Sequence, residues 1–357
     1  MARLLRWACS LLVLVGSGSI LSLASPAWAC GCGAYIPDSS GPSVATERAL
    51  VTWDGTIEDI VMSFNVSGSS ETAAWVMPVP SAAEVSLGDA KLFEELGRIT
   101  APRVEYRDDW WPKFDWLASG SDSGADTAGA PRGAAVNVLD RQRIGPFDVT
   151  RLSAGDSTAL AKWLADNGFP RPEGLDENLS HYVAERWELV AVKLAPAEAG
   201  DALTGDLQPL RLTFASDTVV YPMRLSRSAK VPQTVDLYVL ADHRMDPASV
   251  PVAGTEPTLQ FAGQLDGVTA PGLAPYLPKG TYLTRWNDFI REPGSIDGDY
   301  AFSRAEADTP FQRVVYVTRD RGALTGLILL GVGGLAVLVG AVVVLRRRAL
   351  RRDLVEH

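Results

Sequence analysis

The chain has 357 residues, of which 46% are hydrophobic, and a formal net charge of −10. Its two ends, residues 1–29 and 346–357, carry charges of +2 and +3, so the part between them carries about −15. Affinity for phosphates needs clustered Lys and Arg, so this charge excludes a nucleic-acid partner, and it argues against a body that lies flat on anionic lipid. With only three cysteines, the chain is not a disulfide-stapled scaffold.

Residues 1–29 have the pattern of a secretory signal peptide. Two arginines stand before an apolar run at residues 11–24, and Ala27 and Ala29 occupy the two positions that a signal peptidase reads. Glycine, serine and proline in and after the run disfavour an uncleaved membrane helix. We therefore expect cleavage after Ala29 and export of the chain that follows.

Cys30 and Cys32 stand one glycine apart, directly after the predicted cleavage position. A cysteine at the first mature position resembles a bacterial lipoprotein, but Trp28 fits that signal poorly, so lipidation is the less favoured alternative. The two cysteines can form a disulfide if the chain bends, and Gly31 makes the bend easy. Strain would make such a bond easy to reduce, so a redox pair is a further alternative. No thioredoxin-like pattern surrounds the pair, which favours a structural disulfide or two packed thiols.

The exported part alternates predicted strands with a few predicted helices. Apolar or alternating runs between turn residues predict strands at residues 49–53, 59–66, 72–80, 135–139, 147–154, 188–196, 210–214, 219–226 and 234–241. Apolar residues at helical spacing predict helices at residues 89–99, with Asp89 as N-cap, at 156–167 and from 176 onwards. Residues 243–280 show little periodicity. The predicted fold class is α+β, with antiparallel sheets and a few packed helices, plus one C-terminal transmembrane helix.

Composition divides the chain into six segments. Residues 118–133 are rich in Gly, Ser, Ala and Asp, and such a segment buries too little apolar surface to offset its ordering entropy. They are predicted to be a flexible linker or loop. The segments are the signal peptide 1–29, a first αβ part 30–117, the linker 118–133, a second αβ part 134–322, a transmembrane helix 323–345 and a basic tail 346–357.

Residues 323–345 contain no charged residue and no proline. At a rise of about 1.5 Å per residue they are long enough to cross a hydrocarbon core of about 30 Å. Arginines crowd residues 346–352, and because cytoplasmic flanks carry the excess of positive charge, the C-terminus is predicted to be cytoplasmic. The sequence therefore predicts a single-pass protein of the cell membrane whose N-terminal body lies outside.

The sequence does not supply an evident catalytic or metal-binding set. The exported part has two histidines, His181 and His243, without a nucleophile elbow or a third partner, so both are predicted to be structural. A zinc site needs three or four ligands at suitable spacing, which the sequence lacks. Asp297 and Asp299 fit a solvated turn better than a calcium loop, because no further oxygen ligands follow at alternate positions. We predict no metal, no cofactor and no catalytic residue.

One short segment combines carboxylates with tryptophans. It contains Asp108, Asp109, Trp110, Trp111, Asp115 and Trp116. Carboxylates beside exposed indole rings can form a sugar-binding or glycosidase cleft. Tryptophans are mostly buried packing residues, so the favoured interpretation is a helix-to-loop junction whose rings fill the core.

Several stretches resemble a known family. A Cys-Gly pair follows the signal, a Met-Pro-Val-Pro turn ends a strand at residues 77–80, and a short helix leads to Ala101-Pro102-Arg103. They are similar to the exported bacterial proteins known as domain of unknown function 2330. Residues 145–152, 182–194 and 207–225 resemble the second half of this family's sequences. The likeness covers most of residues 30–240, and the C-terminal part resembles the actinobacterial form. It implies export and no known activity, so no site residue follows from it.

The main hypothesis is a membrane-anchored extracytoplasmic module that binds or scaffolds an unknown protein or glycan of the cell envelope, and is not an enzyme. A first alternative is an envelope thiol-disulfide redox protein that uses Cys30 and Cys32. A second is a carbohydrate-active enzyme that uses residues 108–116.

Overall fold

A computed structural model describes residues 33–39, 41–111, 147–153, 157–196, 198, 200–267 and 269–353. The chain divides into two compact units. Residues Met1–Thr100 and Gln142–Phe311 form the first, here called the body, and Ala101–Arg141 and Gln312–His357 form the second, here called the ribbon–helix unit. The predicted signal peptide, linker and strand at 135–139 lie outside the described residues.

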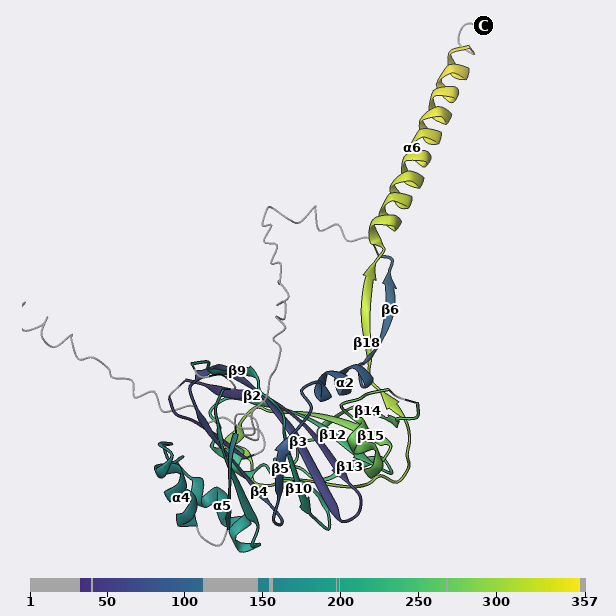
Figure 1. Ribbon diagram of the computed structural model, residues 1–357. Helices are drawn as coiled ribbons and strands as arrows, with labels where there is room; N and C mark the ends of the chain where they lie inside the picture. Colours follow the sequence, from purple (N-terminus) through teal and green to yellow (C-terminus); the bar gives the residue numbers. More distant parts are fainter. Residues whose placement is uncertain are drawn as a thin grey trace, which may run out of the picture. The chain divides into compact units, whose positions relative to one another are not determined.

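A nine-stranded sheet runs through the body (Figure 1). Its strands, in order across the sheet, are β17 (Phe311–Gln312), β14 (Thr258–Gln264), β15 (Tyr282–Ile290), β12 (Gln233–Ala241), β2 (Ser43–Trp53), β3 (Ile57–Ser70), β10 (Leu210–Ala215) and β5 (Glu84–Leu87), and β9 (Leu203–Asp206) also pairs with β3. Most of the described strand pairs in this sheet are antiparallel, but β2 and β12 run parallel, with Val51 opposite Val239. The sheet is therefore mixed at its centre.

A four-stranded antiparallel sheet packs against one face of the large sheet. Its order is β1 (Ala34–Pro37), β4 (Ala73–Val79), β8 (Glu188–Leu194) and β7 (Phe147–Ser153). Successive side chains of a strand point to opposite faces. Trp75 of β4 therefore joins the core shared with the large sheet, whereas Val76 joins a second core under the helices α4 (Ser157–Asp166) and α5 (Leu175–Ala184).

The other face of the large sheet is covered by helical segments. Leu50 of β2 and Tyr238 of β12 pack with α2 (Leu92–Ile99) and with the 3-10 helix η2 (Ala274–Lys279). Gly280 ends η2 where a Cβ would stand 2.3 Å from the carbonyl carbon of Ala241. Only glycine allows this close approach, and it holds η2 against the end of β12.

A small sheet completes the body. It consists of β11 (Val219–Tyr221), β16 (Tyr300–Arg304) and β13 (Met245–Ser249), with the 3-10 helices η1 (Arg224–Ser228) and η3 (Pro293–Ser295) nearby in the chain. Tyr221 and Tyr300 lie in the core shared by the two larger sheets. The small sheet thus closes one part of that core.

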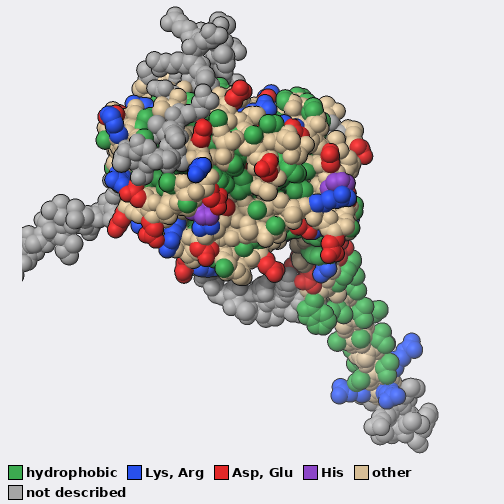
Figure 2. All heavy atoms as spheres, turned by 90° about the horizontal axis from the view of Figure 1, so that it is seen from below, with side chains coloured by type: hydrophobic (Ala, Val, Ile, Leu, Met, Phe, Trp, Pro, Cys, Tyr) green, Lys and Arg blue, Asp and Glu red, His purple; other side chains and the backbone are tan. Residues whose placement is uncertain are grey.

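The ribbon–helix unit pairs two strands and continues into one long helix. β6 (Arg103–Asp109) and β18 (Val314–Asp320) run parallel, and α6 (Gly322–Asp353) follows β18 directly. Residues 322–348 of α6 form a helix that is long and apolar enough to cross a membrane. Its most apolar stretch is not buried against any other described part of the chain. In the space-filling view the helix surface is hydrophobic and arginines gather at its far end (Figure 2).

The predicted fold class is confirmed, including the C-terminal apolar helix, which begins one residue before the predicted 323–345 and ends eight residues after it. Asp89 is not the N-cap of α2: its side chain accepts a hydrogen bond from the Lys91 amide at 2.7 Å, and the helix begins at Leu92. The predicted strand 219–226 ends at Tyr221, because a 3-10 helix follows Pro222 and Met223. Strands from both predicted αβ parts share the same sheets.

Candidate functional site

Four chain segments that are far apart in sequence surround a pocket of about 410 Å³ in the body. It is lined by residues from within 53–55, 217–219, 241–245 and 302–304, and we call it the His243 pocket. Most of the lining is apolar, since Val219, Met245 and Phe302 contribute buried side chains. An apolar hollow with a few polar groups at its rim is the usual form of a ligand-binding site.

The turn between β2 and β3 shapes one side of this pocket. Asp54 Oδ1 accepts hydrogen bonds from the amides of Thr56 at 3.0 Å and Ile57 at 2.8 Å, and Gly55 adopts a φ of 101° that favours glycine. The Ile57 amide lowers the pKa of Asp54. The indole nitrogen of Trp53 donates to the carbonyl of Ser216 at 3.0 Å, which joins this turn to the segment between β10 and β11.

His243 lies at the opposite side and is held by Asp308. Its Nδ1 lies 2.8 Å from Asp308 Oδ2, and the Arg244 amide donates to Asp308 Oδ1 at 2.8 Å. The hydrogen bond with His243 and that amide lower the pKa of Asp308. His243 is therefore paired with a carboxylate that the sequence did not indicate, and it also lines the pocket.

The rim of the His243 pocket carries acidic groups. Asp217 and Asp242 are exposed, and neither carboxylate has a hydrogen-bond or ion-pair partner among the residues that the structure describes. Arg304 also lines the pocket. The arrangement can hold an apolar group whose attached positive charge reaches the two carboxylates.

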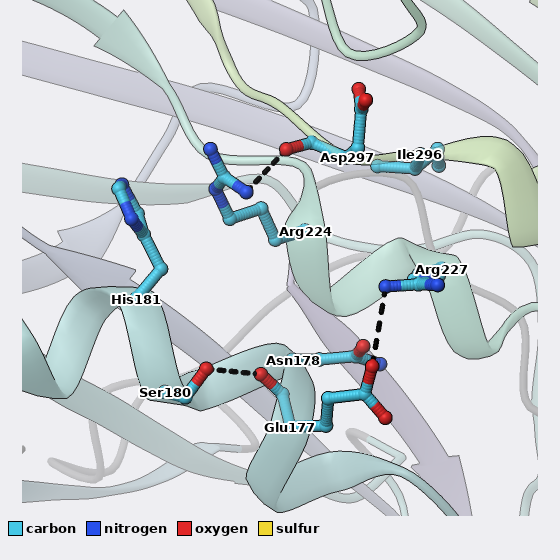
Figure 3. A pocket seen from close by; sticks show the side chains of 8 residues that line it. All are labelled: Glu177, Asn178, Ser180, His181, Arg224, Arg227, Ile296 and Asp297. Carbon is cyan, nitrogen blue, oxygen red and sulfur yellow. Dashed lines mark hydrogen bonds and ion pairs between the residues drawn. The ribbon is translucent and has the colours of Figure 1, made fainter.

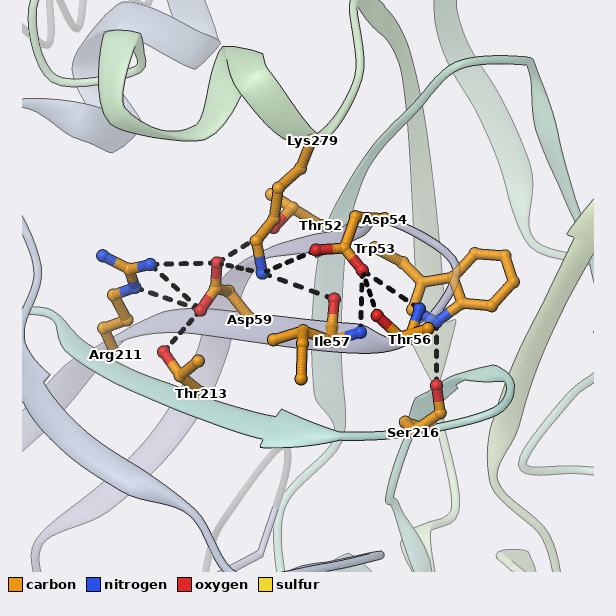
Figure 4. Close-up of polar contacts among 10 residues, drawn as sticks. All are labelled: Thr52, Trp53, Asp54, Thr56, Ile57, Asp59, Arg211, Thr213, Ser216 and Lys279. Atoms are coloured by element: carbon orange, nitrogen blue, oxygen red, sulfur yellow. Dashed lines mark hydrogen bonds and ion pairs between the residues drawn. The ribbon is translucent and has the colours of Figure 1, made fainter.

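A buried carboxylate, Asp59, organises a polar cluster on β3 (Figure 4). Its side chain is fully buried and pairs with Lys279 at 2.9 Å and with Arg211 at 3.0 Å. Burial alone would raise its pKa, but the Thr213 hydroxyl, Lys279 and Arg211 outweigh this and lower the pKa below its usual value. Both carboxylate oxygens of Asp59 are bound by these partners. We therefore interpret the cluster as a structural link between the sheet and η2.

Glu58, the neighbour of Asp59, is buried on the opposite face of β3. Both of its oxygens lie 3.3 Å from the amide of Val220. Burial raises the pKa of Glu58 well above its usual value. Glu58 therefore joins β3 to β11 inside the core, where burial disfavours its charged form.

A second, polar pocket of about 190 Å³ lies beside α5 and η1 (Figure 3). It is lined in part by Glu177, His181, Arg224 and Arg227, and Arg227 lies 3.6 Å from Glu177. His181 pairs with Glu185 at 3.2 Å one helical turn later, in agreement with a structural role. The pocket is small and most of its charged groups are paired, which makes it the weaker candidate.

Asp299 was predicted to belong to a solvated turn, and this is wrong. Its side chain accepts hydrogen bonds from the Tyr182 hydroxyl and the Met223 amide, both at 2.6 Å, and pairs with Arg224 at 3.2 Å. The side chain is only 12% exposed. Its partners are 75 or more residues distant in sequence, so no local pattern could have revealed this role.

The structure describes only part of the predicted carboxylate–tryptophan segment. Asp115 and Trp116 lie outside the described residues, as do Ala27, Ala29, Cys30 and Cys32. Asp108 and Asp109 end β6, and Trp110 and Trp111 follow with 52% and 78% of their surfaces exposed. The interpretation that these two rings fill the core is wrong, because they follow the charged end of a strand instead of a buried helix.

Among the described residues, no group of three or more His, Cys, Asp and Glu side chains is placed to hold a metal ion. The two described histidines each pair with a single carboxylate, and the buried carboxylates are bound to basic groups, hydroxyl groups or backbone amides. In the described part of the body, the geometry therefore favours non-covalent binding of a ligand at the His243 pocket over catalysis or metal binding.

Comparison with known proteins finds likenesses to a curated relative and to a solved structure. A valine–tRNA ligase of Streptomyces coelicolor is 26% identical over 217 residues, which are 53% of this chain and 24% of that protein, so the chain spans about a quarter of its length. The crystal structure of baculovirus P35 superposes with a TM-score of 0.35 and 7% identity, over 74% of this chain and 98% of that one. Neither likeness is close enough to carry an argument about function.

A family of bacterial proteins matches much more of the chain. The family model described as an uncharacterized protein conserved in bacteria, DUF2330, matches residues 26–303. This range contains all four segments of the His243 pocket apart from Arg304. The chain belongs to the DUF2330 family.

Proposed function

We propose that this protein is a membrane-anchored binding module of the cell envelope, with its body outside the cytoplasm. The observation that carries the proposal is α6, whose residues 322–348 form an apolar helix of membrane-spanning length with none of its most apolar window buried. An apolar surface of this length is stable in hydrocarbon and costly in water. An exported N-terminus and the arginines after residue 345 support the orientation.

The His243 pocket is the binding site in this proposal. Its apolar walls suit an aliphatic or aromatic group, and Asp217 and Asp242 suit a positive charge attached to that group. The partner of this chemistry is an envelope protein that presents an apolar side chain beside Lys or Arg. Pairing of such a charge with carboxylates at a rim mainly adds specificity and association rate.

Protease protection tests the anchor and its orientation. The full-length protein carries a C-terminal epitope, and spheroplasts are treated with protease before and after lysis. We expect the body to be digested from outside, and a fragment with α6 and the epitope to be protected until lysis. Removal of the protein from membranes by alkaline carbonate, or a protected body, would overturn the proposal.

Small probes test the pocket. Phenethylammonium presents a ring and a positive charge, whereas 2-phenylethanol and 3-phenylpropionate present the same ring with neutral and negative ends. We expect calorimetry or NMR titration to rank the cation first, and Asp217→Asn with Asp242→Asn to remove its advantage over the alcohol. Equal affinity for all three probes, or no binding, would contradict the assigned chemistry.

Two alternatives remain as proposals with their own tests. The first is the carbohydrate-active enzyme that uses residues 108–116. The rings of Trp110 and Trp111 are exposed, as stacking on a sugar requires, whereas buried rings could not contact a sugar. A redox role requires Cys30 and Cys32 to form a disulfide that mild thiol reagents open. Mass spectrometry of the mature N-terminus, alkylated before and after reduction, decides whether that bond or a lipid is present.

A further inference from the structure

Trp110 and Trp111 lie beside the first residues of the apolar helix. In the parallel ribbon, Asp109 at the end of β6 is opposite Asp320 at the end of β18. The amide of Arg321 then donates to the Asp109 carbonyl at 2.7 Å, directly before α6 begins at Gly322. The chain therefore leaves β6 at the level where the apolar span starts, and Trp110 and Trp111 are its next two residues. Figure 1 shows the end of β6 beside the start of α6.

Local hydrogen bonds fix this junction. Asp109 Oδ1 accepts from the Trp111 amide at 3.1 Å, and Asp320 Oδ1 accepts from the Gly322 amide at 2.8 Å. Arg321 lies 3.7 Å from Asp108. The chain thus leaves β6 and β18 at the same level of the ribbon. The backbone pairing of the ribbon therefore sets where residues 110 and 111 lie relative to the start of α6.

Both indoles are largely exposed, and Trp111 is the most exposed aromatic side chain in the described part of the ribbon–helix unit. Trp111 is 78% and Trp110 52% exposed, and neither ring nitrogen has a hydrogen-bond partner within the described part of the chain. Two adjacent indoles in water leave a large apolar area unburied. An indole has an apolar ring and one N–H donor, and this combination favours the boundary between lipid chains and headgroups.

We propose that Trp110 and Trp111 insert into the headgroup boundary of the membrane that α6 spans, and so anchor the ribbon at a fixed depth. This inference rests on the proposed membrane anchor. The occupant is the lipid boundary because the indoles are continuous with the start of the spanning helix. The charges at the same level are largely paired, since Asp108 contacts Arg321 and Arg319 stacks over the Tyr106 ring at 3.6 Å. Pairing lowers the cost of bringing them close to headgroups.

Fluorescence quenching by brominated lipids tests the proposal. Full-length protein is reconstituted in phosphatidylcholine vesicles with bromine near the headgroup or near the chain end, and wild type is compared with Trp110→Phe plus Trp111→Phe. Eight tryptophans follow the predicted cleavage position at Ala29, so the two indoles account for about a quarter of the emission. We expect the shallow quencher to remove that share in wild type and not in the double variant, and the deep quencher to act less.

Trp163→Phe in α4 is the matched control, and it should leave the lipid-quenched share unchanged. Flotation of the vesicles separates the two proposals: protein that does not float contradicts the anchor. Protein that floats but shows the same quenching in wild type and double variant contradicts the boundary position of the indoles. Quenching that is absent in wild type, together with a shift of indole emission on adding soluble peptidoglycan fragments, would assign the pair to glycan binding and overturn the lipid assignment.

Discussion

Lys279 Nζ lies 2.9 Å from Asp59 Oδ2, and this ion pair joins η2 to an interior strand of the large sheet. The two residues are 220 positions apart in the sequence. The same lysine donates to the Ile57 carbonyl at 3.3 Å, and Arg211 completes the pairing of the carboxylate. The link therefore fixes one of the segments that cover the large sheet.

Replacement of Asp59 by Asn should destabilise the body by about 3 kcal/mol, because it leaves two cations without their buried partner. Urea unfolding followed by tryptophan fluorescence measures the change. Asp206→Asn, which removes a largely exposed partner of Arg48, is the control and should cost at most about 1 kcal/mol. Equal effects of the two substitutions would contradict the buried link.

The Asp59 link also predicts a loss of stability in acid. The pKa of Asp59 is lowered in the folded state, so its contribution is complete above the pKa of an unfolded aspartate, about 3.9. The contribution is lost as the pH falls below about 4 and through the folded pKa. Asp59→Asn should unfold with a weaker pH dependence than wild type in this range, as a series of urea titrations would show.

Glu58→Gln should change the stability of the body in the opposite direction from Asp59→Asn. The pKa of Glu58 is raised in the folded state, so its favourable contribution is present below the unfolded pKa of about 4.3 and is lost as the pH rises. The variant cannot ionise and should be more stable than wild type at pH 7, with the difference shrinking toward pH 4. A difference that does not depend on pH would mean that Glu58 is ionised in the folded body.

Gly280→Ala should destabilise the body by about 1–3 kcal/mol, because the new Cβ would overlap Ala241. Gly294→Ala is the matched control, since no heavy atom lies within 4 Å of its added Cβ. Thermal unfolding of both variants gives the comparison. Equal melting temperatures would show that η2 can move away from β12 at little cost.

Thr218→Trp should block the His243 pocket from its exposed rim without removing a core side chain. We expect the affinity for phenethylammonium to fall at least about tenfold, which corresponds to about 1.4 kcal/mol. Thr218→Ser keeps the rim open and serves as the control. Undiminished binding by the tryptophan variant would place the probe elsewhere.

Local patterns were sufficient for the elements whose signal is local. The alternation around Asp54-Gly55-Thr56 predicted the β2–β3 hairpin, and the uncharged run before the arginines predicted α6. β6 was missed because most of its side chains are charged, and it pairs with β18, more than 200 residues later. A parallel partner at that distance leaves no periodic signal in either strand.

The candidate site could not be predicted for the same reason. Its walls come from four segments, and neither Val219 nor Phe302 differs in sequence from an ordinary core residue. Trp110 and Trp111 were noticed because of their composition, but their exposure follows from the pairing of Asp109 with Asp320. Sequence patterns gave the residue types, and only the fold shows which of them meet.

The parallel pairing of β2 with β12 has a consequence for biogenesis. For a chain that crosses a membrane from its N-terminus, β2 and β3 emerge early, but the strand on the other side of β2 is complete only at Ala241. Until then the hairpin has an open, apolar edge, and pairing over such a sequence separation is slow. In the proposed export, the large sheet is therefore completed only after β12 has crossed the membrane, and the open edge is a site for aggregation until then.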